Sequence, residues 1–322
     1  MKKLISLVAG LAAAALLCVA FVSPSYAQTT TFVSGGGQDI NPCTLAQPCR
    51  GIAHASFVAG NQGGNGGTVS CLDAGPYHES FNTNFSFTLD CRGVVYVASG
   101  NTFALSIQQN DVVTFRHVIF DGATGGGGAV QIISGKAVFE DCTFQNFTAS
   151  PGRAVDFAPA AAGSQLTITD SLFANNGLTG SGGGIIIQPS GSGGAQAVIE
   201  RTTVTGNTYG IFANNTGSTG SILLHIKDST VANSAVHGIS AYTAGSITAI
   251  VIDHSSSLIN GGSGILSQGS GGLVFLSDTT VMSNITGLST AGGGAIYSYG
   301  NNRLTGNASD GVTPVTAGFT LK

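Results

Sequence analysis

Carboxylates that could perform acid–base chemistry recur at matched places along this 322-residue chain. Asp141, Asp170, Asp228 and Asp278 each stand in the turn that follows an alternating apolar segment. Hydrolysis of a glycosidic bond needs two carboxylates at a set separation on one face, and no Asp-Asp pair occurs here. An aspartate in a turn commonly accepts hydrogen bonds from backbone N–H groups. We therefore expect these four aspartates to be structural and to bond backbone donors.

The histidines are dispersed and give no sign of a metal centre. None of the six has a partner at the spacing of metal ligands, so we predict no metal site and expect solvent-facing positions. They are His54, His78, His117, His225, His237 and His254.

Aromatic residues offer a more promising surface for binding. Tyr209 and His237 each precede the Gly of a Gly-Ile pair, and Tyr242, Tyr297 and Tyr299 follow in later segments. If these segments stack, the five side chains lie on one face, where aromatic rings suit sugar binding. Packing between tyrosines of neighbouring segments is the alternative role, and the absence of Trp weakens the sugar interpretation.

One motif repeats through the chain and must position these residues. Each copy has an alternating apolar strand, a two-residue polar break and a second short strand, and the copies recur every 23 to 31 residues. An Asn, Asp or Gly then follows, which suits a corner because Asn tolerates a left-handed backbone. A Gly-Ile strand usually comes third, as at Gly184, Gly210, Gly238 and Gly264.

No single copy can bury its apolar face, whereas parallel stacking of all copies buries one continuous core. The first predicted inner column is Phe115, Phe139, Ile168, Ile199, Ile226, Ile252 and Leu276. The second is Phe120, Phe144, Phe173, Val204, Val231, Leu258, Val281 and Leu304, with an extra residue before Leu258 that we interpret as a bulge. Between them runs a column of small residues that includes Cys142, so this cysteine needs no chemical role.

This pattern predicts an all-β parallel β-helix. A β-sandwich lacks such columns, and propeller blades are longer. We divide the chain into residues 1–27 (signal peptide), 28–66 (first strand and cap), 67–307 (stacked rungs) and 308–322 (C-terminal cap). A short capping helix is expected over about residues 50–59, because an open solenoid end is an aggregation-prone sheet edge.

The first 27 residues have the features of an export signal. Lys2 and Lys3 precede an apolar run over residues 4–22, and Ser25 and Ala27 form a small-residue cleavage site. An uncleaved anchor is the alternative, and we expect no other membrane span. We place the protein in the periplasm, on the cell surface or outside the cell.

Export favours disulfides among the five cysteines that remain after cleavage. Their sequence contexts favour Cys43–Cys49 and Cys71–Cys91, while two other pairings of these four stay open. Cleavage also removes two lysines from a net charge of −4 and leaves −6, which argues against nucleic acid as a partner.

The N-terminal region resembles the start of secreted pectate-lyase-like β-helix proteins, in which Gly-x-Val and Gly-x-Tyr-x-Glu enter the first rung. Here these motifs begin at Gly67 and Gly75. The cysteine pair and the ending at residues 298–307 resemble a group of secreted β-helix proteins of Gram-negative bacteria. The resemblance covers nearly all of residues 28–322 and implies that the parallel β-helix is right-handed.

Because some members of this superfamily are enzymes, the resemblance also implies a test for catalytic residues. Ile252-Asp253-His254 is similar to a pectate lyase motif, and Arg303 is the candidate for the arginine that such lyases use as base. The polar break of the repeat explains Asp253 and His254 equally well. Polygalacturonase motifs are absent, and calcium is expected only if the lyase interpretation holds.

We therefore predict an exported, non-catalytic β-helix protein without a cofactor, in which one solenoid face contacts polysaccharide or other cell-envelope material. A polysaccharide lyase or a related carbohydrate-active enzyme is the alternative.

Overall fold

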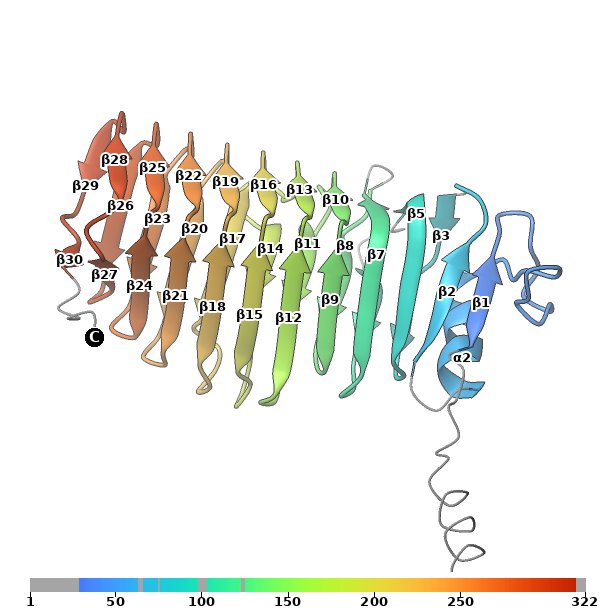
Figure 1. Cartoon of the computed structure of the whole chain (residues 1–322). Coiled ribbons are helices and arrows are strands. Elements are labelled where there is room, and N and C mark those ends of the chain that lie inside the picture. Colours follow the sequence, from blue (N-terminus) through green and yellow to red (C-terminus); the bar gives the residue numbers. More distant parts are fainter. Residues whose placement is uncertain (1–28, 63–65, 75, 98–102, 123–124, 317–322) are drawn as a thin grey trace, which may run out of the picture.

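The computed structural model describes residues 29–62, 66–74, 76–97, 103–122 and 125–316. Over this part the chain winds as a right-handed parallel β-solenoid, as the sequence predicts (Figure 1). Two parallel sheets form the walls: sheet 1 has 20 strands and sheet 2 has 10. The predicted signal peptide and residues 317–322 lie outside the described residues.

Sheet 1 contains a ladder of long strands. Its members are β1 (Thr30–Val33), β2 (Gly67–Cys71), β5 (Phe87–Val97), β7 (Val112–Asp121), β9 (Lys136–Glu140), β12 (Ser164–Thr169), β15 (Ala195–Glu200), β18 (Ile222–Lys227), β21 (Thr248–Asp253), β24 (Gly272–Ser277), β27 (Ala295–Ser298) and β30 (Val315–Thr316). A second ladder of short strands runs beside it and shares β5 and β7. Its other members are β3 (Pro76–His78), β10 (Thr143–Gln145), β13 (Leu172–Ala174), β16 (Thr203–Thr205), β19 (Thr230–Ala232), β22 (Ser256–Leu258), β25 (Thr280–Met282) and β28 (Arg303–Thr305).

Sheet 2 contains the third strand of each turn. Its strands are β4 (Phe81–Thr83), β6 (Phe103–Ile107), β8 (Gly128–Ile132), β11 (Arg153–Phe157), β14 (Gly183–Ile187), β17 (Tyr209–Asn215), β20 (Ile239–Thr243), β23 (Ser263–Gln268), β26 (Thr286–Ala291) and β29 (Ser309–Gly311).

The core consists of stacked side-chain columns, because alternate residues of every strand point inward. The first predicted column, from Phe115 to Leu276, is fully buried. Identical residues meet face to face along the second column, where the rings of Phe120, Phe144 and Phe173 stack with centroids 4.8 and 4.4 Å apart. Cys142 is buried in the small-residue column, and burial raises the pKa of its thiol to about 12.

The predicted columns are wrong by one residue at β22, where Ser255, not Ser256, continues the small-residue column. Ser257, not Leu258, pairs with both Val231 and Val281, and β22 continues the ladder in register without a bulge. A buried serine is tolerated here because its hydroxyl donates to the Gly264 carbonyl at 2.7 Å and accepts from the Asn260 amide at 3.1 Å.

At the corner after each short strand, two neighbouring residues form two separate columns, whereas the sequence analysis treated the asparagines there as one. The outer residue adopts a positive φ, as at Asn146, Asn175 and Asn233. The next residue points inward, and Asn260, Asn284 and Asn307 there form a hydrogen-bonded ladder. The expectation that all the asparagines are left-handed corners therefore holds for the first group alone.

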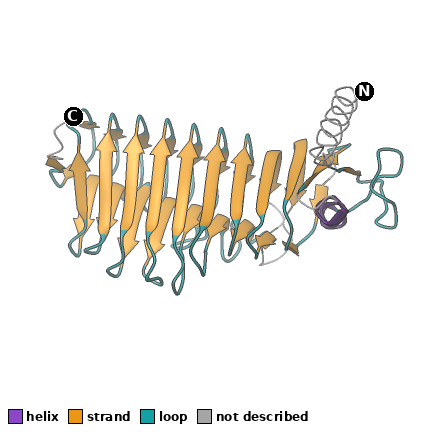
Figure 2. Cartoon of the chain, turned by 60° about the horizontal axis from the view of Figure 1, so that its bottom comes forward, coloured by secondary structure: helices purple, strands orange, loops and turns teal. Residues whose placement is uncertain are grey.

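The predicted capping helix is present as α2 (Ile52–Gln62), at the end of the solenoid opposite the C-terminal strands (Figure 2). It begins two residues later than expected, because Asp39 Oδ1 accepts hydrogen bonds from the Arg50 and Gly51 amides. The Glu79 carboxylate then accepts the Ile52 and Ala53 amides at 2.8 Å each. Both predicted disulfides, Cys43–Cys49 and Cys71–Cys91, join segments around this end.

Candidate functional site

Four aromatic side chains gather on the outer face of sheet 2, and we call them the aromatic patch: Tyr209, Phe212, His237 and Tyr242. Tyr209 and Phe212 stack with centroids 5.0 Å apart. Tyr242 meets Phe212 edge to face at 4.9 Å, and His237 lies 6.1 Å from Tyr209. Phe212 and Tyr242 lie outside because they alternate with buried residues such as Ile211. Tyr209 and His237 each precede a glycine that faces the buried side chains, so the alternation is interrupted there.

The imidazole of His237 is held in one hydrogen-bonded state. The Ser263 backbone amide donates to His237 Nδ1 at 3.0 Å, so this nitrogen carries no proton while the bond exists. Burial lowers the pKa of His237. Burial also raises the pKa of Tyr242. Both rings are therefore neutral near pH 7.

A buried ion pair lies on the same face, two strands from the patch. Asp156 is 1% exposed, and its Oδ2 accepts hydrogen bonds from Gln131 Nε2 at 3.0 Å and Arg153 Nη1 at 3.2 Å. Desolvation raises the pKa of Asp156, and the positive charge of Arg153 opposes that shift. Strand register places Asp156 beside Ile186 and Ile186 beside Phe212, so the pair and the patch share one outward-pointing column, in which Ile186 between them is buried.

The structure separates the five predicted binding residues. Tyr209, His237 and Tyr242 are brought together, whereas Tyr297 belongs to sheet 1, where its ring stacks on Phe275 with centroids 5.1 Å apart. Tyr299 follows the same strand and is 48% exposed. The expectation of one common face is wrong because Tyr297 lies on the first strand of its turn, and Tyr242 on the third.

Sequence reasoning missed Phe212, although a signal was available. Phe212 alternates with Ile211 and Ala213, which are both fully buried. Period-2 alternation from Ile211 would have placed Phe212 outside, whereas its contact with Tyr209 depends on the inward-facing Gly210.

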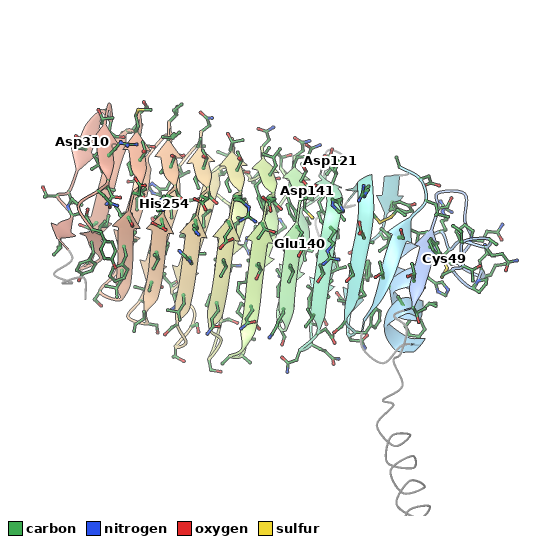
Figure 3. The ribbon with its side chains drawn as sticks, viewed as in Figure 1. Cys49, Asp121, Glu140, Asp141, His254 and Asp310 are labelled. Carbon is green, nitrogen blue, oxygen red and sulfur yellow. A yellow bond between two sulfur atoms is a disulfide. The ribbon has the colours of Figure 1, made fainter. Side chains whose placement is uncertain are left out.

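Many charged side chains gather elsewhere, at the turn between the long and short strands of sheet 1 and on the strand residue just before it. We call this line of turns the charged corner. Its turn residues all have positive φ and are His117, Asp141, Asp170, Arg201, Asp228, His254 and Asp278. Figure 3 shows Glu140, Asp141 and His254 along it.

Among the described residues, no backbone amide donates to the carboxylates of the four corner aspartates, contrary to our expectation. Arg201 donates to both oxygens of Asp170 at 2.8 and 2.9 Å, and His254 Nε2 lies 3.2 Å from Asp278. The nearby backbone amides have other acceptors, such as the Ser229 hydroxyl, which accepts from the Thr202 amide at 3.1 Å. The carboxylates are therefore free to pair with cations of neighbouring turns.

The three catalytic candidates fall on or near this corner. His254 Nδ1 lies 2.9 Å from Asp253 Oδ1, and that hydrogen bond raises the pKa of the exposed His254. Arg303 begins β28 and pairs with Thr280, which itself pairs with Ser256. Arg303 thus lies two turns beyond His254, and it forms no ion pair within the described ranges.

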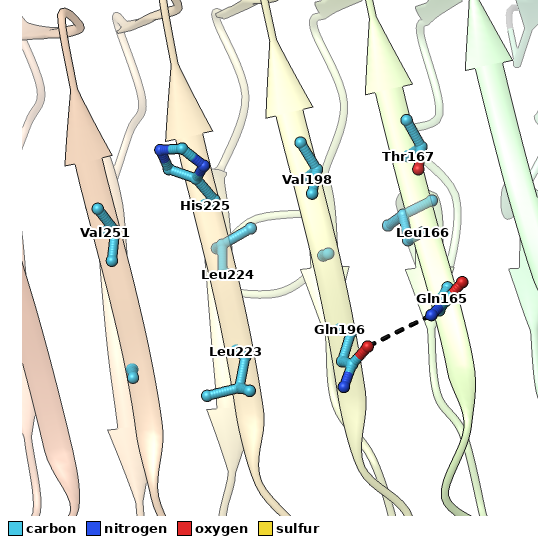
Figure 4. A pocket seen from close by; sticks show the side chains of 11 residues that line it. Gln165, Leu166, Thr167, Gln196, Val198, Leu223, Leu224, His225 and Val251 are labelled. Carbon is cyan, nitrogen blue, oxygen red and sulfur yellow. Dashed lines mark hydrogen bonds between the residues drawn. The ribbon is translucent and has the colours of Figure 1, made fainter.

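A shallow groove of about 690 Å³ crosses the outer face of sheet 1 from β12 to β21 (Figure 4). Its walls are mainly aliphatic, including the exposed Val198, Leu223 and Val251, with His225 between them. Gln165 donates to Gln196 at 3.3 Å along one side.

A second cavity of about 570 Å³ lies at the start of α2, between Asp39, Arg50, His54, Tyr77 and Glu79. The carboxylates here are engaged by helix amides, and burial is the main cause that raises the pKa of Glu79. In the described part of the chain, the one group with metal-ligand spacing is Cys43, Cys49 and His54. Its two sulfur atoms form a disulfide and cannot act as thiolate ligands.

Comparison with known proteins supports the fold. Residues 84–224 match the family described as the right handed beta helix region. A solved structure, a rhamnogalacturonan lyase, aligns over 84% of this chain and 75% of its own, with 11% identity and a TM-score of 0.31. An identity and a TM-score this low say nothing about activity. No curated protein sequence matches the chain. Among the described residues, no helix is long and apolar enough to span a membrane.

Proposed function

We propose that this right-handed β-helix protein is exported and binds glycans through the aromatic patch, without cleaving them. The observation that carries the proposal is the contact of four aromatic side chains over β17 and β20 on an otherwise regular sheet face. Sugar rings present apolar C–H faces that pack on aromatic rings, while their hydroxyls take hydrogen bonds from neighbouring polar groups. Two disulfides support export, because such bonds persist in oxidising compartments.

The patch fits a glycan better than the groove on sheet 1 does. Aliphatic side chains such as Leu223 and Val198 line most of that groove, and they offer no ring face. Around the patch, amide groups stand beside the rings: Asn214 pairs in register with Tyr242, and Gln188 follows β14. A face with both rings and amides can hold a sugar by stacking and by hydrogen bonds.

The absence of cleavage is proposed from the chemistry around the patch. Glycosidic hydrolysis uses two carboxylates that flank the bond. Asp156 is the one carboxylate on the described strands from β8 to β23 of sheet 2, and it is buried and paired with Arg153. A bound glycan would therefore meet no acid–base pair on this face.

The test is affinity electrophoresis of residues 28–322 through gels that contain plant or bacterial polysaccharides. We expect retention by at least one polymer, and we expect Tyr209→Ala and Tyr242→Ala each to weaken it about two- to tenfold. Tyr297→Ala is the matched control, since this tyrosine also stacks on an aromatic ring but lies on sheet 1. Equal losses in all three variants, or no retention by any polymer, would refute the proposal.

The second candidate function is a polysaccharide lyase, and the contact between Asp253 and His254 is the observation in its favour. The same polymers are incubated with the protein, with and without calcium, and their chain length is followed over time. Shortening that disappears in His254→Gln would replace the binding proposal with the lyase.

A further inference from the structure

We infer that the aromatic patch selects uncharged glycans, and that Asp156 sets this selectivity by cancelling the charge of Arg153. The inference rests on the proposed glycan-binding function and adds the class of ligand. It assigns Asp156 a role in specificity without contact with the sugar, since Asp156 is 1% exposed while the Arg153 side chain is 25% exposed.

The distribution of charge is the first argument. Arg153 and Asp156 are the only Lys, Arg, Asp or Glu residues on the described strands β8 to β23 of sheet 2. More than half of the 15 acidic residues lie on the charged corner of sheet 1 instead. These are Asp90, Glu140, Asp141, Asp170, Glu200, Asp228, Asp253 and Asp278.

The geometry of the ion pair is the second argument. Arg153 and Gln131 both donate to Asp156 Oδ2, while Asp156 Oδ1 is buried without a hydrogen-bond partner among the described residues. The adjacent guanidinium and the two donors on Oδ2 favour the ionised carboxylate and oppose the desolvation that raises its pKa. An arginine on a binding face would otherwise attract carboxylate or sulfate groups of a glycan. With Asp156 beside it, Arg153 presents N–H donors and no net charge to a ligand on this face.

The state of His237 completes the neutral surface. Its Nδ1 accepts the Ser263 amide, so protonation of the ring would break that bond. A ligand that spans Arg153 and the aromatic patch therefore meets stacked rings and hydrogen-bonding groups with no net charge. The mature chain has a net charge of −6 after loss of two lysines from −4, which further disfavours acidic polymers.

The experiment compares two polymers with the same backbone, the acidic polygalacturonate and its neutral, fully methyl-esterified form. The plant and bacterial polysaccharides of the electrophoresis test are measured alongside them. Binding is measured in low and high salt. We expect the wild-type protein to prefer the neutral partner by about fivefold or more at low salt. Asp156→Asn keeps the side-chain shape and leaves Arg153 uncompensated, so it should reduce or reverse this preference, and high salt should remove the change.

Two further variants separate the effect from altered folding and from net charge. Arg153→Gln combined with Asp156→Asn should restore the neutral preference, because no unpaired charge remains. Asp278→Asn changes net charge by the same amount on the charged corner and should leave the preference unchanged. Thermal unfolding of each variant reports on the fold.

The outcomes distinguish the two proposals. Retention that is equal or stronger for acidic polymers, or a preference that Asp156→Asn leaves unchanged, would overturn the selectivity while the binding function stands. Loss of retention for every polymer would overturn both. A neutral preference that Asp156→Asn lowers and the double variant restores would support the inference.

Discussion

Replacement of Asn284 by alanine should destabilise the protein more than any change to an exposed asparagine. The Asn284 side chain is buried, and its Oδ1 accepts hydrogen bonds from the Asn260 backbone amide at 2.9 Å and from Asn260 Nδ2 at 2.8 Å. Its Nδ2 donates to the Ser257 carbonyl at 3.0 Å and to Asn307 Oδ1 at 3.0 Å. The side chain thus links three successive turns of the solenoid.

The magnitude follows from the groups that alanine would leave without a partner. A buried donor that loses its acceptor costs about 1–3 kcal/mol. The backbone amide of Asn260 is such a donor, whereas the side-chain Nδ2 of Asn260 keeps the Ser257 hydroxyl as an acceptor at 3.1 Å. The Ser257 carbonyl also loses a donor. We therefore expect the free energy of unfolding to fall by about 2–4 kcal/mol.

Urea unfolding followed by circular dichroism measures this change as a shift of the midpoint at constant slope. Asn214→Ala is the control, since the half-buried Asn214 lies near the end of β17 and its Oδ1 accepts, among the described contacts, only from the amide and hydroxyl of the exposed Thr216. It should cost less than about 1 kcal/mol. If Asn284→Ala costs no more than the control, the asparagine ladder contributes specificity of register and not stability, and our reasoning is wrong.

Three other predictions follow from the structure. Reduction of Cys71–Cys91, which closes a 20-residue separation, should lower stability by about 3 kcal/mol, seen as a fall in the melting temperature under reductant. In an NMR titration, Asp253→Asn should move the pKa of His254 down towards its ordinary value near 6.5. Because the pKa of His254 is raised in the folded protein, the contact stabilises the fold below about pH 6.5, and this effect is lost as the pH rises through the folded pKa. A His254 pKa that Asp253→Asn leaves unchanged would exclude the contact with Asp253. Leu258→Ala should lower the free energy of unfolding by less than about 1 kcal/mol, whereas the same change at a buried leucine costs about 2–5 kcal/mol. A cost in the higher range would show that Leu258 points into the core, as the sequence analysis predicted.

The columns of the core could be predicted because a parallel stack repeats the same environment in every turn. Each apolar residue of the motif meets its own copies above and below, so the sequence pattern and the packing share one period. The prediction failed at Leu258, where a serine fills an apolar place. The sequence analysis assigned the inner position to the nearest large apolar residue, Leu258, one residue too late. A serine is not recognised as a core residue from its type, and Ser257 is buried only because its hydroxyl finds hydrogen-bond partners.

The candidate site was predictable in part. Tyr209 and Tyr242 lie on the third strand of adjacent turns and His237 lies just before β20, and their common face follows from the Gly-Ile pattern. Tyr297 resembles them in sequence, but its register with Phe275 puts it on the first strand. The pairing of Asp156 with Arg153 gave no repeat signal, because these residues occur in a single turn and acquire their partners through burial.

The arrangement of charge connects the fold to the proposed function. In a parallel solenoid a residue type that repeats in every turn stacks on itself about 4.8 Å apart, so a column of like charges repels itself. The charged corner reduces this repulsion in part of its length, where Arg201 stands between Asp170 and Asp228 and His254 stands between Asp228 and Asp278. Exposed pairs of this kind contribute only about 0–1 kcal/mol each. Because many of the charged residues lie at this corner, the described strands β8 to β23 of sheet 2 carry Arg153 and Asp156 alone, and this is the basis of the proposed neutral binding face.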